Sequence, residues 1–205
     1  AKLIHEVEKV MGEVPCASYE IVLIDDCSKD RTFEVVGELA TSHRSIKCLG
    51  LSRNVGHQNA LSCGLEAAEG DIVITLDGDL QHPPSLFPEM LKLWENGADV
   101  VNTIRRNSGS SSMAEKTFSK WFYRVFNRVA EVSLVPGSAD FRLLDRKCVN
   151  ALNEMDEHFK FFRGQVPYIG FNQVELPFDC PPRFAGQRSY TLRQSMRLAS
   201  NGIFS

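Results

Sequence analysis

Residues 70–84 read GDIVITLDGDLQHPP, and the interpretation of the whole chain starts from this stretch. Its apolar run is short and rich in β-branched residues, which predicts a buried strand that the two prolines end in a turn. Asp77 and Asp79 follow the strand with only Gly78 between them. Paired carboxylates at a strand end can bind a hard cation, Mg²⁺ or Mn²⁺, and such a metal usually carries phosphates. The alternative is that the two aspartates only cap the following turn.

The same succession of strand, polar loop and helix repeats on both sides of this stretch. Strands that alternate with helices predict an α/β fold, in which a mainly parallel sheet lies between two layers of helices. The expected helices cover residues 2–11, 33–39, 59–69, 86–95 and 147–155, and the expected strands cover residues 19–24, 45–51, 72–76, 99–104, 139–146 and 173–178.

Charged side chains follow four consecutive strands of this series. They are Asp25 with Asp26, Arg53, Asp77 with Asp79, and Arg105 with Arg106. Because ligands bind outside the carboxyl ends of parallel strands, we expect these charges to line one binding site. A purely structural protein would have little reason to gather charge at one edge of its sheet.

A later strand carries two further charges, Asp140 and Arg142, which alternate with apolar neighbours. This alternation is typical of a strand with one polar face. The sequence leaves two interpretations of Asp140 open: a general base, or the ion-pair partner of a nearby arginine.

Basic residues are concentrated in two segments. Residues 113–133 combine an apolar, aromatic stripe with a basic face formed by Lys116, Lys120, Arg124 and Arg128. This pattern fits a helix packed on the core, which periodicity alone favours, and also a helix at an anionic membrane surface. The second segment has no acidic residue and predicts contact with an external anion or a membrane surface. Its cations are Arg183, Arg188, Arg193 and Arg197.

Length and composition narrow the class of protein. The chain has 205 residues, enough for one domain with a buried core, and a net charge of −3, which argues against a general nucleic-acid binder. Its six cysteines are scattered without a close pair, so we expect neither a zinc site nor a disulfide framework, and a reducing compartment is favoured. No apolar run reaches the roughly 18 residues that a membrane span needs.

Several segments, taken in order, carry a resemblance to a known family. They are DDCSKDRT at 25–32, SRNVGH at 52–57, DGDLQHPP at 77–84, DFRL at 140–143 and RFAGQRSY at 183–190. They are similar to the DDxSxDxT, SRNxGH, DxDLQxPP, DFRL and RxxGxSKY motifs of family 2 glycosyltransferases, which have the Rossmann-like GT-A fold. More narrowly, the chain resembles the polyprenyl-phosphate branch, with its dolichol-phosphate mannose synthases and bacterial undecaprenyl-phosphate sugar transferases.

The resemblance implies a role for each matching residue. Nucleotide-sugar binding falls to Asp25, Asp26, Ser28, Asp30, Arg53 and Asp77. A divalent metal, Mg²⁺ or Mn²⁺, would be bound by Asp77, Asp79 and Gln81. Catalysis is assigned to Asp77, Asp140 and Arg142. Binding of the acceptor phosphate is assigned to Arg142, Arg183, Arg188 and Tyr190.

The implied activity is the transfer of a sugar from a UDP- or GDP-sugar to a polyprenyl phosphate at the cytoplasmic face of the membrane. A lipid monophosphate is anionic near neutral pH, so it can attack the anomeric carbon without a strong base, which leaves Asp140 to orient it. Attack opposite the leaving group predicts inversion at that carbon. Self-association into a homo-oligomer stays an open alternative.

The chain departs from the family pattern at both ends. The family's first strand is missing, transmembrane helices expected after residue 205 are missing, and GQRSY stands where GxSKY is usual. We therefore expect a GT-A catalytic domain at 1–182 that lacks its first strand and a basic juxtamembrane segment at 183–205, together a soluble fragment of a membrane-anchored enzyme. Loss of that strand would leave a central strand with an unpaired edge and weaken donor binding.

Three rival interpretations use the same residues. A phosphoacceptor receiver module also places acids after its strands, but the DxD spacing, a length beyond about 150 residues and the lack of a matching late lysine count against it. A phosphatase with a DxD nucleophile carries that motif on its first strand, whereas Asp77 comes later. A family 2 transferase with a surface-polysaccharide acceptor is the third, and the basic segments favour a lipid phosphate over it.

Overall fold

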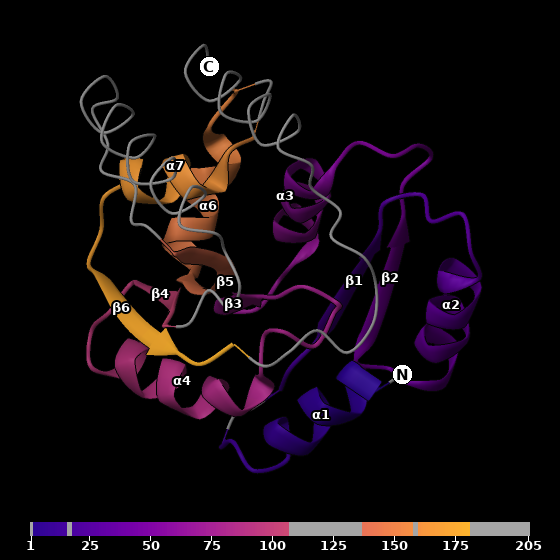
Figure 1. Ribbon diagram of the computed structural model, residues 1–205, viewed down its shortest axis with the longest axis horizontal. Helices are drawn as coiled ribbons and strands as arrows, with labels where there is room; N and C mark the ends of the chain where they lie inside the picture. Colours follow the sequence, from indigo (N-terminus) through magenta and orange to yellow (C-terminus); the bar gives the residue numbers. More distant parts are fainter. Residues whose placement is uncertain (1, 16–17, 107–136, 158–159, 181–205) are drawn as a thin grey trace, which may run out of the picture.

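The computed structural model describes residues 2–15, 18–106, 137–157 and 160–180 (Figure 1). Its helices are α1 (Lys2–Met11), α2 (Thr32–Ser42), α3 (His57–Ala67), the 3₁₀ turn η1 (Pro84–Leu86), α4 (Phe87–Glu95), α6 (Arg146–Glu154) and α7 (Phe162–Tyr168). Its strands are β1 (Ile21–Asp25), β2 (Ile46–Gly50), β3 (Ile72–Thr75), β4 (Val100–Arg105), β5 (Ser138–Asp145) and β6 (Gln173–Phe178). Every helix and strand expected in these ranges is present, and the α/β class is confirmed. The short helix α7 was not among the expected elements.

The strands form two sheets. β1 and β2 pair in parallel, while the larger sheet has the order β3-β5-β4-β6. β4 and β6 are parallel, but β5 lies between β3 and β4 and runs antiparallel to both. The expectation of a mainly parallel arrangement therefore holds for two of the pairings and not for β5. Strand direction could not be predicted because both kinds of ladder satisfy the backbone groups of an apolar strand equally well.

Helices cover both faces of the larger sheet, with α1 and α4 on one side and α6 and α7 on the other (Figure 1). β5 contributes to both layers, because successive side chains of a strand point to opposite faces. Phe141 and Leu143 join the core beneath α1 and α4, while Leu144 joins a second core that includes residues of α3, α6 and α7. Asp140 and Arg142 share the side of Leu144, so their polar face is buried between strand and helices.

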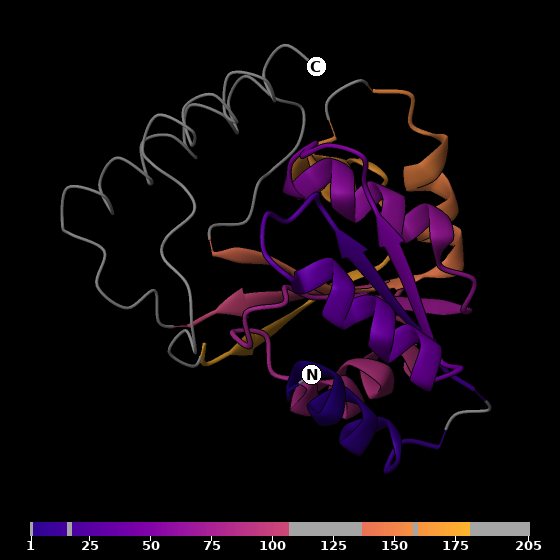
Figure 2. The ribbon, with the colours of Figure 1, turned by 90° about the vertical axis from the view of Figure 1, so that its right-hand side faces the viewer.

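The smaller sheet lies between α2 and α3, as Figures 1 and 2 show. β1 pairs with β2 along one edge and β3 pairs with β5, and among the described residues no strand occupies the second edge of β1 or of β3. The apolar residues of both strands are accordingly only half-buried. Within the described residues β1 and β3 are therefore edge strands of their own sheets.

Some expectations concern residues outside the described ranges. They include the segment 113–133 and the tail 183–205, with Arg183, Arg188 and Tyr190. Within the described ranges, each helix is too short or too polar to span a bilayer.

The packing of α4 gives a first prediction. Met90 is fully buried in the core between α1, α4 and the sheet. Met90→Ala should lower the free energy of unfolding by about 2–5 kcal/mol, because it removes buried methylenes and leaves a cavity. The control is Val35→Ala at a 39% exposed site on α2, where a change of about 0.5 kcal/mol or less is expected. Urea denaturation of both variants measures this, and equal losses would contradict the assigned core.

Candidate active site at the strand ends

The reversed direction of β5 places its beginning beside the end of β3. Arg142 is in register with both Thr75 of β3 and Asn102 of β4. The hydroxyl of Thr75, which is buried, donates to the backbone carbonyl of Asp140 at 2.6 Å. The two charged residues of β5 therefore lie at the same edge of the sheet as Asp77, although more than sixty positions separate them in the chain.

The first acidic loop follows β1 and is joined to residues 54–56. The carboxylate of Asp26 accepts hydrogen bonds from the side chain of Asn54 at 2.9 Å and from the backbone N–H groups of Val55 and Gly56 at 2.7 and 2.9 Å. Three donors leave this carboxylate little capacity for another ligand. Asp26 therefore ties the two loops together and fixes the start of α3.

Asp25, in contrast, has an acceptor oxygen to spare. One oxygen accepts the N–H of Ser28 at 3.0 Å across a turn in which Cys27 has a positive φ of 56°. The other oxygen, Oδ1, is buried and has no hydrogen-bond partner. A buried oxygen in this state is costly unless a ligand satisfies it.

The remaining residues of this loop have simpler surroundings. Asp30 accepts the N–H of Thr32 at the start of α2, and hydrogen bonds from Thr32 lower the pKa of its carboxyl. Because Asp30 precedes the N-cap residue Arg31 and bonds the N–H two residues on, this is an Asx-turn that leads into the helix. Ser28 and Arg53 are exposed beside the acidic loop.

The second acidic loop, residues 77–82, follows β3. Asp79 accepts the N–H of Gln81 at 3.1 Å around Leu80, whose φ is +64°. The turn-capping interpretation of Asp79 is therefore correct for one of its oxygens. Backbone in the left-handed region is unfavourable for leucine, and such strain concentrates at functional sites. Asp77 is partly exposed at 33%.

His82 is buried beneath this loop and supports it, although no role was predicted for this residue. It is fully buried, its Nδ1 accepts the N–H of Asp77 at 2.9 Å, and its ring stacks on Phe141 at 5.1 Å. Burial lowers the pKa of His82, which favours a neutral ring. Arg105 Nη2 lies 3.0 Å from His82 Nε2, and Arg105 Nε is buried without a partner.

Asp140 is the centre of the site. Its side chain is 6% exposed. Oδ1 lies 3.4 Å from Arg142 Nη2, while Oδ2 is approached by Gln58 and Arg163 at 3.3 Å and by His57 at 3.4 Å. Burial alone would raise the pKa of Asp140, but Arg163, His57 and Arg142 outweigh it and hold the pKa well below its usual value. Asp140 therefore stays ionised and pairs with cations. Because its pKa is low, it is a weak base.

Arg142 lies behind Asp140 in the protein interior. It is 2% exposed and donates to the carbonyl oxygens of Ala139 at 3.0 Å and Phe162 at 3.3 Å. Its Nε is buried without a partner. Burial on this scale argues against direct contact between Arg142 and an acceptor phosphate, the role that the resemblance implies.

His57 connects Asp140 to the second acidic loop. Its Nε2 lies 3.4 Å from Asp140 and 3.6 Å from Asp77. The hydrogen bond with Asp140, followed by the charge of Asp77, raises the pKa of His57. His57 was not assigned a role from the sequence, although it closes the SRNVGH segment.

Some of the residues expected in the site lie together in the structure, in contact with residues that were not expected there. Asp77, Asp140 and Arg142 share one cluster with three residues that the sequence did not single out: His57, Gln58 and Arg163. The Asp25–Asp26 loop joins this cluster through residues 54–57. No three His, Cys, Asp or Glu side chains of the described residues form a metal-binding group.

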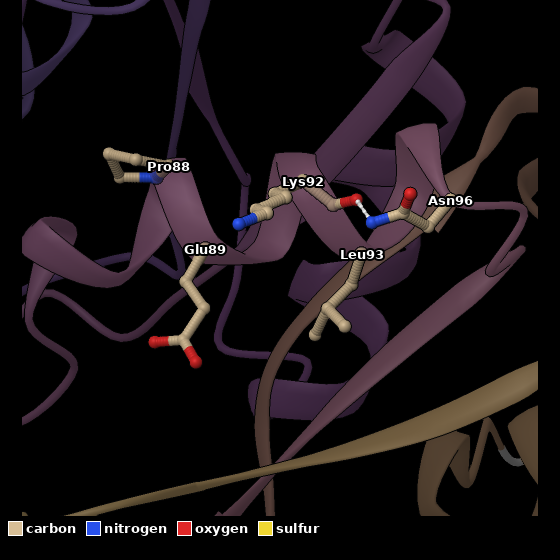
Figure 3. A pocket seen from close by; sticks show the side chains of 5 residues that line it. All are labelled: Pro88, Glu89, Lys92, Leu93 and Asn96. Carbon is tan, nitrogen blue, oxygen red and sulfur yellow. Dashed lines mark hydrogen bonds between the residues drawn. The ribbon is translucent and has the colours of Figure 1, made fainter.

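A separate pocket of about 520 Å³ lies on the outer side of α4 (Figure 3). It is lined by Pro88, Glu89, Lys92 and Leu93 of that helix and by Asn96, the residue that follows it. None of these residues belongs to the cluster at the strand ends, so we do not assign this pocket to the candidate active site.

The chain belongs to glycosyl transferase family 2, whose family model matches residues 2–152. It is 39% identical over 188 residues to an uncharacterized glycosyltransferase of Synechocystis sp., a match that covers 92% of this chain and 59% of that protein. It is 31% identical over 203 residues to a prophage bactoprenol glucosyl transferase homolog of Escherichia coli, covering 99% of this chain and 66% of the relative. The chain thus spans about three fifths to two thirds of the length of these relatives.

Two solved structures share the fold. One is glucosyl-3-phosphoglycerate synthase from Mycobacterium tuberculosis, solved with Mn²⁺, UDP-glucose and phosphoglyceric acid (TM-score 0.63, 14% identity, 95% of this chain and 70% of that one). The other is the mannosyltransferase PcManGT from Pyrobaculum calidifontis, solved with GDP-mannose and Mn²⁺ (TM-score 0.56, 21% identity, 93% and 55%). The GT-A fold is confirmed, and the family match decides against a receiver module and a phosphatase.

The buried ion pair gives a second prediction. Asp140→Asn should lower the free energy of unfolding at pH 7 by about 3–5 kcal/mol, because Arg142 would keep a buried charge without a counterion. Because the pKa of Asp140 is depressed in the folded protein, the unfolded chain binds more protons than the folded one below about pH 5. The free energy of unfolding of the wild type therefore decreases as the pH is lowered through that range.

Asp140→Asn should lose this part of the pH dependence, whereas the exposed Asp71→Asn control should keep it. Urea denaturation at pH 7 and pH 4 measures both effects. If Asp140→Asn proved as stable as the wild type at pH 7, the buried pair would not contribute as described.

Proposed function

We propose that this chain is the catalytic part of an inverting transferase that moves a sugar from a nucleotide-sugar donor to a polyprenyl phosphate. Family membership supports the transfer of a sugar, and relatives that are named bactoprenol glucosyl transferases support a polyprenyl acceptor. The observation that carries the proposal is the cluster at one sheet edge, where two acidic loops meet buried and exposed cations around Asp140.

Donor binding is proposed at the first acidic loop. Asp25 is the better candidate for the base or ribose, because its buried Oδ1 has no partner, whereas the carboxylate of Asp26 is occupied by the neighbouring loop. Ser28 and Arg53 are exposed where they could contact the nucleotide, and Asp30 supports the loop through its hydrogen bond with the N–H of Thr32. UDP- and GDP-sugars both remain candidates, since each occurs in a solved structure of this fold.

Metal binding is proposed at the second acidic loop. Asp77 and Asp79 offer oxygen ligands from partly exposed side chains, with Gln81 beside them. A pair of carboxylates suits Mg²⁺ or Mn²⁺, which keep positions open for substrate phosphates, better than it suits an all-protein cage. When bound, the metal would neutralise the charge of the departing nucleoside diphosphate. His82 and Leu80 hold the loop in the shape that presents these oxygens.

Asp140 is proposed to organise the reacting groups without taking a proton. A phosphate monoester with a second pKa of about 6 is largely dianionic at neutral pH and needs no strong base. The low pKa of Asp140 makes it a poor proton acceptor, but its carboxylate aligns His57 and Arg163 at the open side of the cluster. Catalysis of this kind is positioning and electrostatic stabilisation, and attack opposite the leaving group inverts the anomeric carbon.

The acceptor side is proposed to include the membrane. Residues 1–182 would form the catalytic domain and residues 183–205 a basic segment at the cytoplasmic surface, with Arg183, Arg188 and Tyr190 near the acceptor phosphate. The arginines of this segment have no acidic residue among them in the sequence, which supports contact with anionic lipid headgroups. The alternative within the family is a surface-polysaccharide acceptor.

An acceptor assay tests the proposal. The whole protein, supplied with labelled UDP- and GDP-sugars and Mn²⁺, should transfer label to undecaprenyl phosphate in detergent and not to soluble glycans. Alkaline phosphatase treatment of the lipid should abolish the transfer, because the phosphate is the nucleophile. Label that appears only in glycan would replace the proposed acceptor with the polysaccharide alternative.

The proposed metal site gives a further prediction. Asp79→Ala should reduce metal-dependent turnover at least a hundredfold, about 2.7 kcal/mol of transition-state stabilisation. It should also raise the Mn²⁺ concentration needed for half-maximal activity, because one ligand is lost. Asp71→Ala, at an exposed carboxylate elsewhere on the surface, is the matched control. Turnover of Asp79→Ala within about tenfold of wild type, roughly 1.4 kcal/mol, would rule out this role.

A further inference from the structure

Arg163 differs from the other charged groups that surround Asp140. Its side chain is 42% exposed, whereas that of Arg142 is 2% exposed, and both guanidinium groups approach the same carboxylate. His57 is 38% exposed, but its charge depends on pH, while a guanidinium keeps its charge. The planar fork of arginine also matches the oxygens of a phosphate group. Arg163 therefore has the charge, the exposure and the geometry to contact a phosphate.

The carboxylate of Asp140 is shared among several donors. Asp140 carries one negative charge and is approached by Arg142, Arg163 and His57. These contacts, with that of Gln58, measure 3.3 to 3.4 Å, longer than the 2.7–2.9 Å typical of charge-assisted hydrogen bonds, because several donors share the two oxygens. Asp77 also faces His57 at 3.6 Å, so Arg163 is the member of this cluster that combines a permanent positive charge with an exposed side chain.

The backbone at Arg163 is held by two side chains. Phe162, the preceding residue, donates its N–H to Gln58 Oε1 at 2.9 Å, and its carbonyl accepts from Arg142 at 3.3 Å. The amide nitrogen of Gln58 donates to Asp140 at 3.3 Å. Gln58 thus links the start of α7 to the same carboxylate that Arg163 contacts, and it sets the position of α7 relative to β5.

We propose that Arg163 binds a phosphate group of a substrate and that Gln58 is a positioning residue that holds Arg163 beside Asp140. The inference rests on the proposed transferase function and adds residues that the family motifs did not point to. The phosphate belongs either to the diphosphate of the donor or to the monophosphate of the acceptor. Both present the same oxyanion to a guanidinium, so separate measurements on each substrate must distinguish them.

Steady-state kinetics of Arg163→Gln, Arg163→Lys and Arg44→Gln in the whole protein test the role of Arg163. Arg44 is an exposed arginine before β2, away from the strand ends, so its loss changes the net charge equally. Arg163→Gln should raise one KM at least tenfold, which corresponds to 1.4 kcal/mol of binding free energy. Arg163→Lys should recover part of the loss because it restores the charge but not the fork, and Arg44→Gln should match the wild type.

The substrate whose KM rises identifies the phosphate. A higher KM for undecaprenyl phosphate assigns the contact to the acceptor, and a higher KM for the nucleotide sugar assigns it to the donor. If both KM values of Arg163→Gln stay within twofold of wild type, the proposal is overturned even where kcat falls, because a group that holds a phosphate must contribute to its binding.

The role of Arg163 can also be tested if the proposed acceptor is wrong. If the wild-type protein transfers no sugar to undecaprenyl phosphate, titration calorimetry with UDP and Mn²⁺ tests the donor contact without turnover. Tenfold weaker binding to Arg163→Gln than to wild type would support the role, and equal binding would overturn it.

A double-mutant cycle tests Gln58. Gln58→Met keeps the volume of the side chain but removes both hydrogen bonds, so it should raise the same KM at least threefold in the wild-type background. In the Arg163→Gln background the same change should have little effect, because no guanidinium is left to position. An equal rise in both backgrounds would show that Gln58 acts independently of Arg163 and would overturn its positioning role.

Discussion

The buried carboxylate of Asp140 is the constraint on which the rest of the site depends. Burying a charge costs several kcal/mol unless cations and hydrogen bonds compensate for it. Here the compensation comes from the start of α3, from Arg142 of the same strand, and from Arg163 at the start of α7, while the buried Thr75 hydroxyl separately holds the backbone carbonyl of Asp140. Each partner belongs to a different element, so satisfying this one carboxylate also fixes how α3, α7 and the sheet meet.

The two acidic loops have similar turn geometries. In each, an aspartate accepts a backbone N–H two or three residues later, across a residue with positive φ: Cys27 in the first loop and Leu80 in the second. The two turns directly follow β1 and β3. They also differ, because Asp26 uses its whole carboxylate to hold the neighbouring loop, whereas Asp25 keeps a buried oxygen without a partner. Structural and binding roles are thus divided between adjacent acids.

This arrangement suits a reaction that needs electrostatic organisation more than proton transfer. A phosphate nucleophile brings its own charge, and a diphosphate leaving group needs positive charge nearby. The cluster provides one buried arginine, one exposed arginine and a histidine around a carboxylate whose pKa lies well below its usual value. A carboxylate in that state orients cations and stays ionised, so the same group that stabilises the fold can also position the substrates.

The order and type of almost every element, the acidic motifs and the family could be predicted from the sequence, because apolar periodicity and local turn chemistry depend on residues close together in the chain. It placed Asp77, Asp140 and Arg142 among the site residues. The three-dimensional contacts alone reveal that β5 runs antiparallel between β3 and β4, that Arg142 is buried and Arg163 exposed, and that Asp25, unlike Asp26, keeps a buried oxygen without a hydrogen-bond partner. These properties arise from contacts between residues up to a hundred positions apart, such as Gln58 with the start of α7, and no local pattern encodes them.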